Sequence, residues 1–259
     1  EYDVVQAKQT VRNHGSGWLP RLEAMGIAAW CHVLYGKTAR GPYQLLGKAY
    51  FFGVDDLWSI SDWRIDAVTE DLTLGIDAYR AGYSLGIVDR YVQDICPSNF
   101  SDWVDQKRRW AAGPYPYLRG REFEFGELFR FWTYGVSNQV VALVNVVGVP
   151  AGVLYFLFWL AGFDLYYSPV LVVVLAVNVV NWSYYSLKTY RATIDAVEFR
   201  STRERILFYL GSNPVTQLVY SMLWAIPVTL AMWDYLWASA PAEFHVTPKD
   251  VETLTEPEK

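Results

Sequence analysis

The chain has 259 residues, of which 53% are hydrophobic and 17% aromatic, and its formal net charge is −5. The acidic balance disfavours a nucleic-acid partner, and no basic stripe with interleaved aromatic residues points the other way. Two cysteines, Cys31 and Cys96, give no disulfide framework, and three scattered histidines offer no zinc-ligand spacing. These classes of protein are therefore set aside.

The first part of the chain predicts a mixed α/β region. Residues 2–8 (YDVVQAK) are strand-like, residues 18–36 have helical periodicity, and residues 82–89 (GYSLGIVD) read as a short strand after a glycine. Helices that alternate with short strands predict α/β architecture over residues 1–112.

Long apolar segments follow. Residues 137–161 and 166–187 carry no charge and exceed the roughly 20 residues that cross a bilayer. Two buried helices of a soluble core are the alternative. A third segment, 213–238, contains two prolines and Asp234, so it is a kinked span, a re-entrant segment or an interfacial helix.

Residues 113–134 mix Arg and Glu with many aromatic residues, which predicts a helix in the membrane interface, with an ordinary amphipathic surface helix as the alternative. Lys and Arg collect around 107–130 and again after residue 187, whereas the 162–168 link has only Asp164. The apolar segments predict an integral membrane protein. By the positive-inside rule, its α/β region is expected to face the cytoplasm. The predicted parts are 1–112, 113–134, 135–238 and a C-terminal tail, 239–259.

Two adjacent carboxylates open a predicted helix at 69–71 (TED). Thr69 suits an N-cap, Glu70 and Asp71 suit the positive end of the helix dipole, and Gly82 suits the C-terminal cap. Capping alone would explain these residues. The alternative is that one carboxylate takes a proton from a substrate.

Two further short motifs carry chemistry. Residues 106–110 (QKRRW) combine an amide, a guanidinium and an indole, which suits a sugar phosphate: Arg109 can bind a pyrophosphate through two hydrogen bonds, and Trp110 can stack on a pyranose. A basic cluster beside a membrane is the alternative. Residues 244–249 (FHVTPK) would by themselves be a short strand that ends at a proline.

Together and in this order, the three motifs resemble the membrane-embedded family 2 glycosyltransferases of the cellulose synthase-like type. The matches are TED at 69–71, Q-x-x-R-W at 106–110, and the gating-loop motif F-x-V-T-x-K at Phe244, Val246, Thr247 and Lys249. The resemblance implies that residues 1–112 are the C-terminal part of a GT-A-type domain and that 239–259 holds a gating-loop-like segment in an acidic tail.

The resemblance also implies roles for these residues. Asp71, within the motif of Thr69, Glu70 and Asp71, matches the general base that activates an acceptor hydroxyl. Gln106, Arg109 and Trp110 match the group that holds the acceptor end near the donor pyrophosphate. Thr247 and Lys249, with Phe244 and Val246, match the loop that closes over bound nucleotide. Residues 50–53 (YFFG) look similar to the acceptor-side segment.

The implied partners are a nucleotide diphosphate sugar, with a UDP-sugar favoured, a glycan or lipid-linked acceptor, and the lipid bilayer. The implied cofactor is a divalent cation, Mg²⁺ or Mn²⁺. The D-x-D motif that binds it is expected upstream, and VDD at 54–56 lies on the wrong side of the pattern. No metal ligand is therefore assigned in this chain.

The leading hypothesis is an inverting, processive β-glycan synthase. A single-transfer enzyme with a lipid-linked acceptor is one alternative, and a non-enzymatic membrane scaffold or transporter subunit is another. A gating loop that reaches the active site requires an even number of crossings between Trp110 and Phe244. Two spans satisfy this, with 213–238 interfacial or re-entrant.

Overall fold

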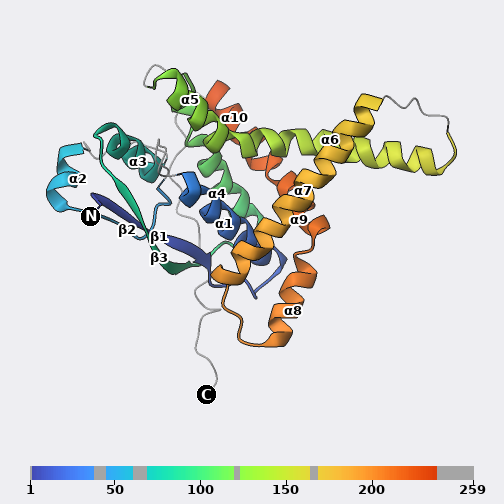
Figure 1. The fold of residues 1–259 in the computed structure, drawn as a ribbon, viewed down its shortest axis with the longest axis horizontal. Coiled ribbons are helices and arrows are strands. Elements are labelled where there is room, and N and C mark those ends of the chain that lie inside the picture. Colours follow the sequence, from blue (N-terminus) through green and yellow to red (C-terminus); the bar gives the residue numbers. More distant parts are fainter. Residues whose placement is uncertain (1, 38–44, 61–68, 120–122, 164–168, 238–259) are drawn as a thin grey trace.

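The fold is described by a computed structural model, which covers residues 2–37, 45–60, 69–119, 123–163 and 169–237 (Figure 1). Its first part contains, in chain order, the elements β1 (Val4–Val11), α1 (Trp18–Lys37), β2 (Tyr50–Phe52), α2 (Val54–Ile60), α3 (Glu70–Arg80), β3 (Leu85–Asp94) and α4 (Phe100–Ala112). Strands and helices alternate along this part. The mixed α/β architecture predicted for it is therefore confirmed.

The sheet has the order β2-β1-β3. Strand β1 pairs antiparallel with β2 and parallel with β3, and the β1–β3 register shifts between Ala7 and Lys8. The parallel pair needs a long crossover connection, and the chain from α1 to α3 supplies it. Strand β3 is longer than the sequence pattern indicated, because it continues to Asp94.

Helix α3 follows the TED motif and ends in a cap of the predicted kind. Gly82 has φ of +77° just after the helix. The Tyr83 amide donates to the Ala78 carbonyl at 3.0 Å, and the Gly82 amide donates to the Tyr79 carbonyl at 3.1 Å. These two bonds form a Schellman motif, in which a left-handed glycine satisfies the last carbonyls of the helix.

Segment 113–134 is not one helix, so the prediction of a single interfacial helix is wrong in its continuity. A 3₁₀ turn, η2 (Tyr115–Arg119), is followed by α5 (Phe125–Phe131) and a π-helical turn, η3 (Trp132–Val136). Pro114 and Pro116 remove the amides that an α-helix would need here. A capping box between Glu124 and Glu127 then starts α5 afresh.

The remaining helices are α6 (Ser137–Leu160), α7 (Pro169–Ala196), α8 (Thr202–Gly211), α9 (Pro214–Leu223) and α10 (Ala225–Trp237). Helix α6 extends away from the α/β part, and α7 returns and packs against α1 (Figure 1). Helices α9 and α10 form one apolar stretch that is interrupted at Trp224, shortly before Pro227, one of the two prolines of this segment.

Two helical stretches of the described residues are long and apolar enough to cross a membrane, namely Ser137–Leu160 and Pro214–Trp237. Only 6% of the most apolar window of the first is buried inside the protein, against 28% for the second. An apolar helix with so little protein around it needs another apolar environment. The second predicted span corresponds to α7, and the number of crossings stays a prediction.

Helix α4 joins the α/β part to the apolar helices. On one side, Trp103 packs with Leu19 and Leu22 of α1 and with Tyr220 of α9. On another side, Ala111 packs with Val228 and Ala231 of α10. The end of α4 is therefore held by the body of the protein and by the helices predicted to lie in the membrane.

Gly82→Ala is expected to lower the free energy of unfolding by about 1–2 kcal/mol, because a Cβ at φ of +77° is strained even though nothing lies within 4 Å of it. Gly126→Ala is the matched control, since its added Cβ also meets nothing and its φ is not positive. Chemical denaturation of both variants measures the difference. Equal stability of the two variants would contradict the assignment of the cap.

Candidate active site

The Asp71 carboxylate lies at the first turn of α3, against the backbone of Gly47. A Cβ built on Gly47 would lie 2.7 Å from Asp71 Oδ2, and Gly47 has φ of +69°. The positive φ favours glycine at position 47, and a larger residue there would displace the Asp71 carboxylate. The Gly47 backbone therefore lies closer to the Asp71 carboxylate than it could if residue 47 carried a side chain.

Two glutamines of β1 fix the peptide next to Gly47. Gln6 Oε1 accepts from the Leu46 amide at 2.9 Å, and Gln9 Nε2 donates to the Leu46 carbonyl at 2.8 Å. Residues three apart face opposite sides of a regular strand, but the register shift between Ala7 and Lys8 brings both side chains to Leu46. The irregularity in β1 thus helps to hold the wall of the Asp71 site.

Burial raises the pKa of Asp71 from 3.8 to about 6. A hydrogen bond from the Leu72 amide to Asp71 Oδ1, 2.8 Å long, opposes this shift, as does the charge of Arg109, whereas the charge of Glu70 adds to the shift. Burial outweighs both opposing effects and that of the Asp71 backbone amide, which also lowers the pKa. The carboxylate is therefore ionised at neutral pH but more basic than an exposed aspartate.

The first two motifs meet through Thr69 and Gly113. A Cβ on Gly113, just after α4, would lie 2.4 Å from Thr69 Oγ1, so the Thr69 side chain packs directly against the Gly113 backbone. Arg109, one turn earlier, interacts electrostatically with Asp71. The structure thus brings the TED and Q-x-x-R-W motifs together at one place.

The acceptor-side segment predicted at 50–53 lies close to the same place. Residues Tyr50–Phe52 form β2, and the charges of Asp71 and Glu70 add to the effect of burial in raising the pKa of Tyr50. Asp56, which belongs to the VDD sequence, lies at the start of α2 with its Oδ2 against Gly53. Its position agrees with a role at the helix N-terminus.

The three consecutive cations of α4 face three different carboxylates. Lys107 pairs with Glu23 of α1. Arg108 donates from Nε and Nη2 to the two oxygens of Asp234, at 2.5 and 2.6 Å. Arg109 is the cation that interacts with Asp71. The cluster therefore links α4 to α1, α10 and α3 in turn.

The other two residues of the motif differ in burial. Gln106 is buried, whereas Trp110, at the end of α4, is 38% exposed. An exposed indole that is held on one side is suited to stacking on a sugar ring. The roles implied for these residues stay predictions.

Some predicted details are corrected or lie outside the described residues. Thr69 is the N-cap residue of α3, but its side chain makes no cap hydrogen bond. Thr69 contributes its carbonyl instead, which accepts from the Thr73 amide at 3.2 Å. The gating-loop residues Phe244, Val246, Thr247 and Lys249 lie outside the described residues.

Sequence reasoning missed three residues that build the site, namely Gly47, Glu23 and Gly113. The sequence does single out Glu23, because it is the one acidic residue in the helical segment 18–36. The two glycines gave none, because their role depends on which residue approaches them in the fold.

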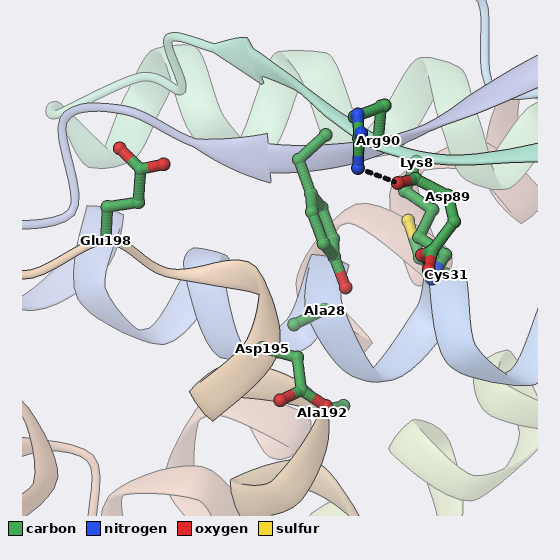
Figure 2. A pocket seen from close by; sticks show the side chains of 9 residues that line it. Lys8, Ala28, Cys31, Asp89, Arg90, Ala192, Asp195 and Glu198 are labelled. Atoms are coloured by element: carbon green, nitrogen blue, oxygen red, sulfur yellow. Dashed lines mark hydrogen bonds and ion pairs between the residues drawn. The ribbon is translucent and has the colours of Figure 1, made fainter.

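A separate cavity of about 530 Å³ lies between the sheet and the helices α1 and α7 (Figure 2). It is lined by Lys8, Ala28, Cys31, Asp89, Arg90, Tyr91, Ala192, Asp195 and Glu198. Lys8 and Asp89 form an ion pair at its edge (Figure 2). None of the lining residues belongs to the three motifs, so this cavity is distinct from the Asp71 site.

The chain matches the family described as glycosyl transferase family group 2 over residues 1–241. It therefore belongs to the family 2 glycosyltransferases and is an enzyme of sugar transfer. The family implies a nucleotide sugar and an acceptor as its partners. No curated protein and no solved structure gives a significant match to the chain.

Family 2 glycosyltransferases generally use a divalent cation. Within the described ranges, no group of three or more His, Cys, Asp or Glu side chains is placed to hold a metal ion.

Gly47→Ala is expected to lower sugar transfer at least about tenfold, because the added methyl group displaces the Asp71 carboxylate and a 1 Å error in a catalytic group can cost about 10²-fold. Gly82→Ala is the matched control: it shares the positive φ but meets nothing within 4 Å. Initial rates of both folded variants test this. Equal activity in the two would show that the approach of Gly47 to Asp71 does not matter.

Proposed function

We propose that this protein is a membrane-embedded, inverting glycosyltransferase of the cellulose synthase-like type, in which Asp71 is the general base. One observation carries the proposal: a carboxylate with a pKa of about 6 lies within electrostatic reach of Arg109, and the two come from separate motifs. A base is most efficient when it is ionised at the working pH and still basic. Burial makes Asp71 more basic, while the Leu72 amide and Arg109 keep its pKa low enough for it to be ionised at neutral pH.

The reaction is a single displacement. An acceptor hydroxyl oxygen attacks the anomeric carbon of the donor sugar, a new glycosidic bond forms, and the bond to the nucleoside diphosphate oxygen breaks. Asp71 takes the hydroxyl proton, and the bonding electron pair leaves with the diphosphate. Arg109 suits the departing charge, since a guanidinium binds phosphate oxygens in pairs.

The acceptor is proposed to be a growing β-glycan. Trp110 supports this, because an exposed indole at the end of α4 offers a stacking platform for the terminal sugar. A single-transfer enzyme with a lipid-linked acceptor is the second candidate. Product length separates them: incubation with UDP-sugars followed by gel filtration should give polymer, whereas one added sugar would rule the polymerase out.

Membrane embedding is supported by α6, whose apolar surface is almost uncovered by protein. We propose that the α/β part is cytoplasmic, because Lys and Arg flank the first span on the α4 side. Protease protection in sealed vesicles tests the orientation. Cleavage sites in the α/β part should be accessible only from the cytoplasmic face.

Asp71→Asn is expected to lower kcat about 10²- to 10⁴-fold, because the amide keeps the shape of the side chain but cannot accept the proton. Its free energy of unfolding at pH 7 should equal or exceed that of the unchanged protein, since an amide avoids burying a charge. A carboxylate that only stabilised the helix dipole would instead give a less stable variant with normal transfer. Initial rates and denaturation curves together decide between the roles.

The pH dependence follows from the raised pKa. Transfer should rise with pH through about 6, because Asp71 must lose its proton to act as a base. The folded state holds that proton between about pH 4 and 6 more tightly than the unfolded state, so this group's contribution to stability falls as pH rises. Arg109→Gln should move the acid limb of kcat/KM to higher pH. A limb that stays near pH 4 in the unchanged protein would contradict the assignment.

A further inference from the structure

Lys107 lies inside the Q-x-x-R-W motif at a position that the motif leaves open, and it is completely buried. An ammonium group has three N–H donors and no acceptor. Four partners face it: Glu23 Oε1, Gln106 Oε1 at 3.0 Å, the Trp110 ring, whose centroid is 3.5 Å from Nζ, and the more distant Trp224 ring at 5.6 Å. Lys107 therefore faces two residues of the motif, one residue of α1, and Trp224 at the end of α9.

Glu23 in turn is held by three donors from two other helices. Lys107 Nζ and Trp103 Nε1 come from α4, the latter at 3.0 Å, and the Tyr220 hydroxyl comes from α9. A buried carboxylate is tolerated only when it is paired and its lone pairs are occupied. Glu23 meets both conditions, so Lys107 has a fixed counter-ion.

Lys107 decides how the Gln106 amide is turned. Because the ammonium can only donate, the Gln106 oxygen must face it, and the NH₂ end is directed elsewhere. No acceptor for Gln106 Nε2 is recorded among the described residues. That amide nitrogen is therefore free to donate to a hydroxyl or ring oxygen of a ligand.

Lys107 also covers one face of the Trp110 ring. A cation over an indole is attracted by the negative face of the ring, and the attraction is stronger where the cation is removed from water. Trp110 as a whole remains 38% exposed, so the residue is accessible to a ligand. One buried cation thus holds both the hydrogen-bonding group and the stacking group of the motif.

We propose that Lys107, clamped by Glu23, is a positioning residue that orients the Gln106 amide and the Trp110 ring for the terminal sugar of the acceptor. This inference rests on the proposed function. It deepens that function by assigning acceptor recognition to a pair of charges that do not themselves touch the substrate.

The test uses the double variant Glu23→Gln/Lys107→Met. Removing both charges at similar volume avoids leaving one charge unpaired, so the variant is expected to fold. Lys8→Met/Asp89→Asn is the matched control, because it removes an ion pair from β1 and β3 outside the motifs. Thermal unfolding confirms that each protein is folded before the measurements.

The first readout is the Trp110 ring itself, followed by ¹⁹F NMR of 5-fluorotryptophan-labelled protein in detergent. The Trp110 signal is assigned as the one missing from Trp110→Phe. It should shift and broaden in the Glu23→Gln/Lys107→Met variant and stay unchanged in the control. An unmoved signal would overturn the proposal whatever the substrate is.

The second readout is the kinetics of transfer with UDP-glucose and cellotetraose or UDP-N-acetylglucosamine and chitotetraose. The acceptor KM should rise about tenfold in the double variant, as expected for the loss of a desolvated cation–π contact, while the donor KM stays unchanged. In a Gln106→Ala/Trp110→Ala background the same change should add nothing. A rise in acceptor KM that persists in that background would contradict action through those two residues.

The outcomes keep the two proposals apart. Normal transfer by Asp71→Asn would overturn the proposed function, and the NMR result would still decide whether Lys107 fixes Trp110. Inactive Asp71→Asn with an unchanged acceptor KM in the double variant would overturn only the positioning role.

Discussion

The arrangement of the site depends on the hydrogen bonds of the buried Glu23 carboxylate. Its donors are Lys107, Trp103 and Tyr220. A buried charge is strongly destabilising when one of its partners is lost, so α1, α4 and α9 are held in one arrangement. The end of α4 then faces Asp71. Since α9 belongs to an apolar stretch long enough to cross a membrane, the position of the site and that of the apolar helices are set by the same buried group.

At Asp71, two opposing effects act on one carboxylate. The start of a helix favours the ionised form, and the Leu72 amide adds a hydrogen bond to it. Burial favours the neutral form and is the larger effect. Thr69 contributes no side-chain cap, and Gly47 leaves room for the carboxylate only because it has no Cβ. A group that served only as a cap would not require such a close approach.

What the sequence could predict was local. The helix after the TED motif, its glycine cap at Gly82 and the apolar helix from residue 137 follow from periodicity and capping rules, and all three are observed. Pro114 and Pro116 indicate a break within 113–134, but the aromatic and charged composition of the segment favours a single helix. The sequence could not predict the partners of Lys107 and Arg108, because each of these ion pairs joins residues that are distant in the chain.

Asp234 shows how such a pair accommodates a charge at the end of an apolar stretch. A carboxylate in an apolar stretch is costly unless it is paired, and the planar Arg108 group satisfies both of its oxygens. Because Arg108 belongs to α4, the polar end of α10 lies beside the α/β part. The proposed gating motif begins a few residues after Trp237, where α10 ends. The chain therefore leaves α10 beside α4, the helix that carries the Q-x-x-R-W motif.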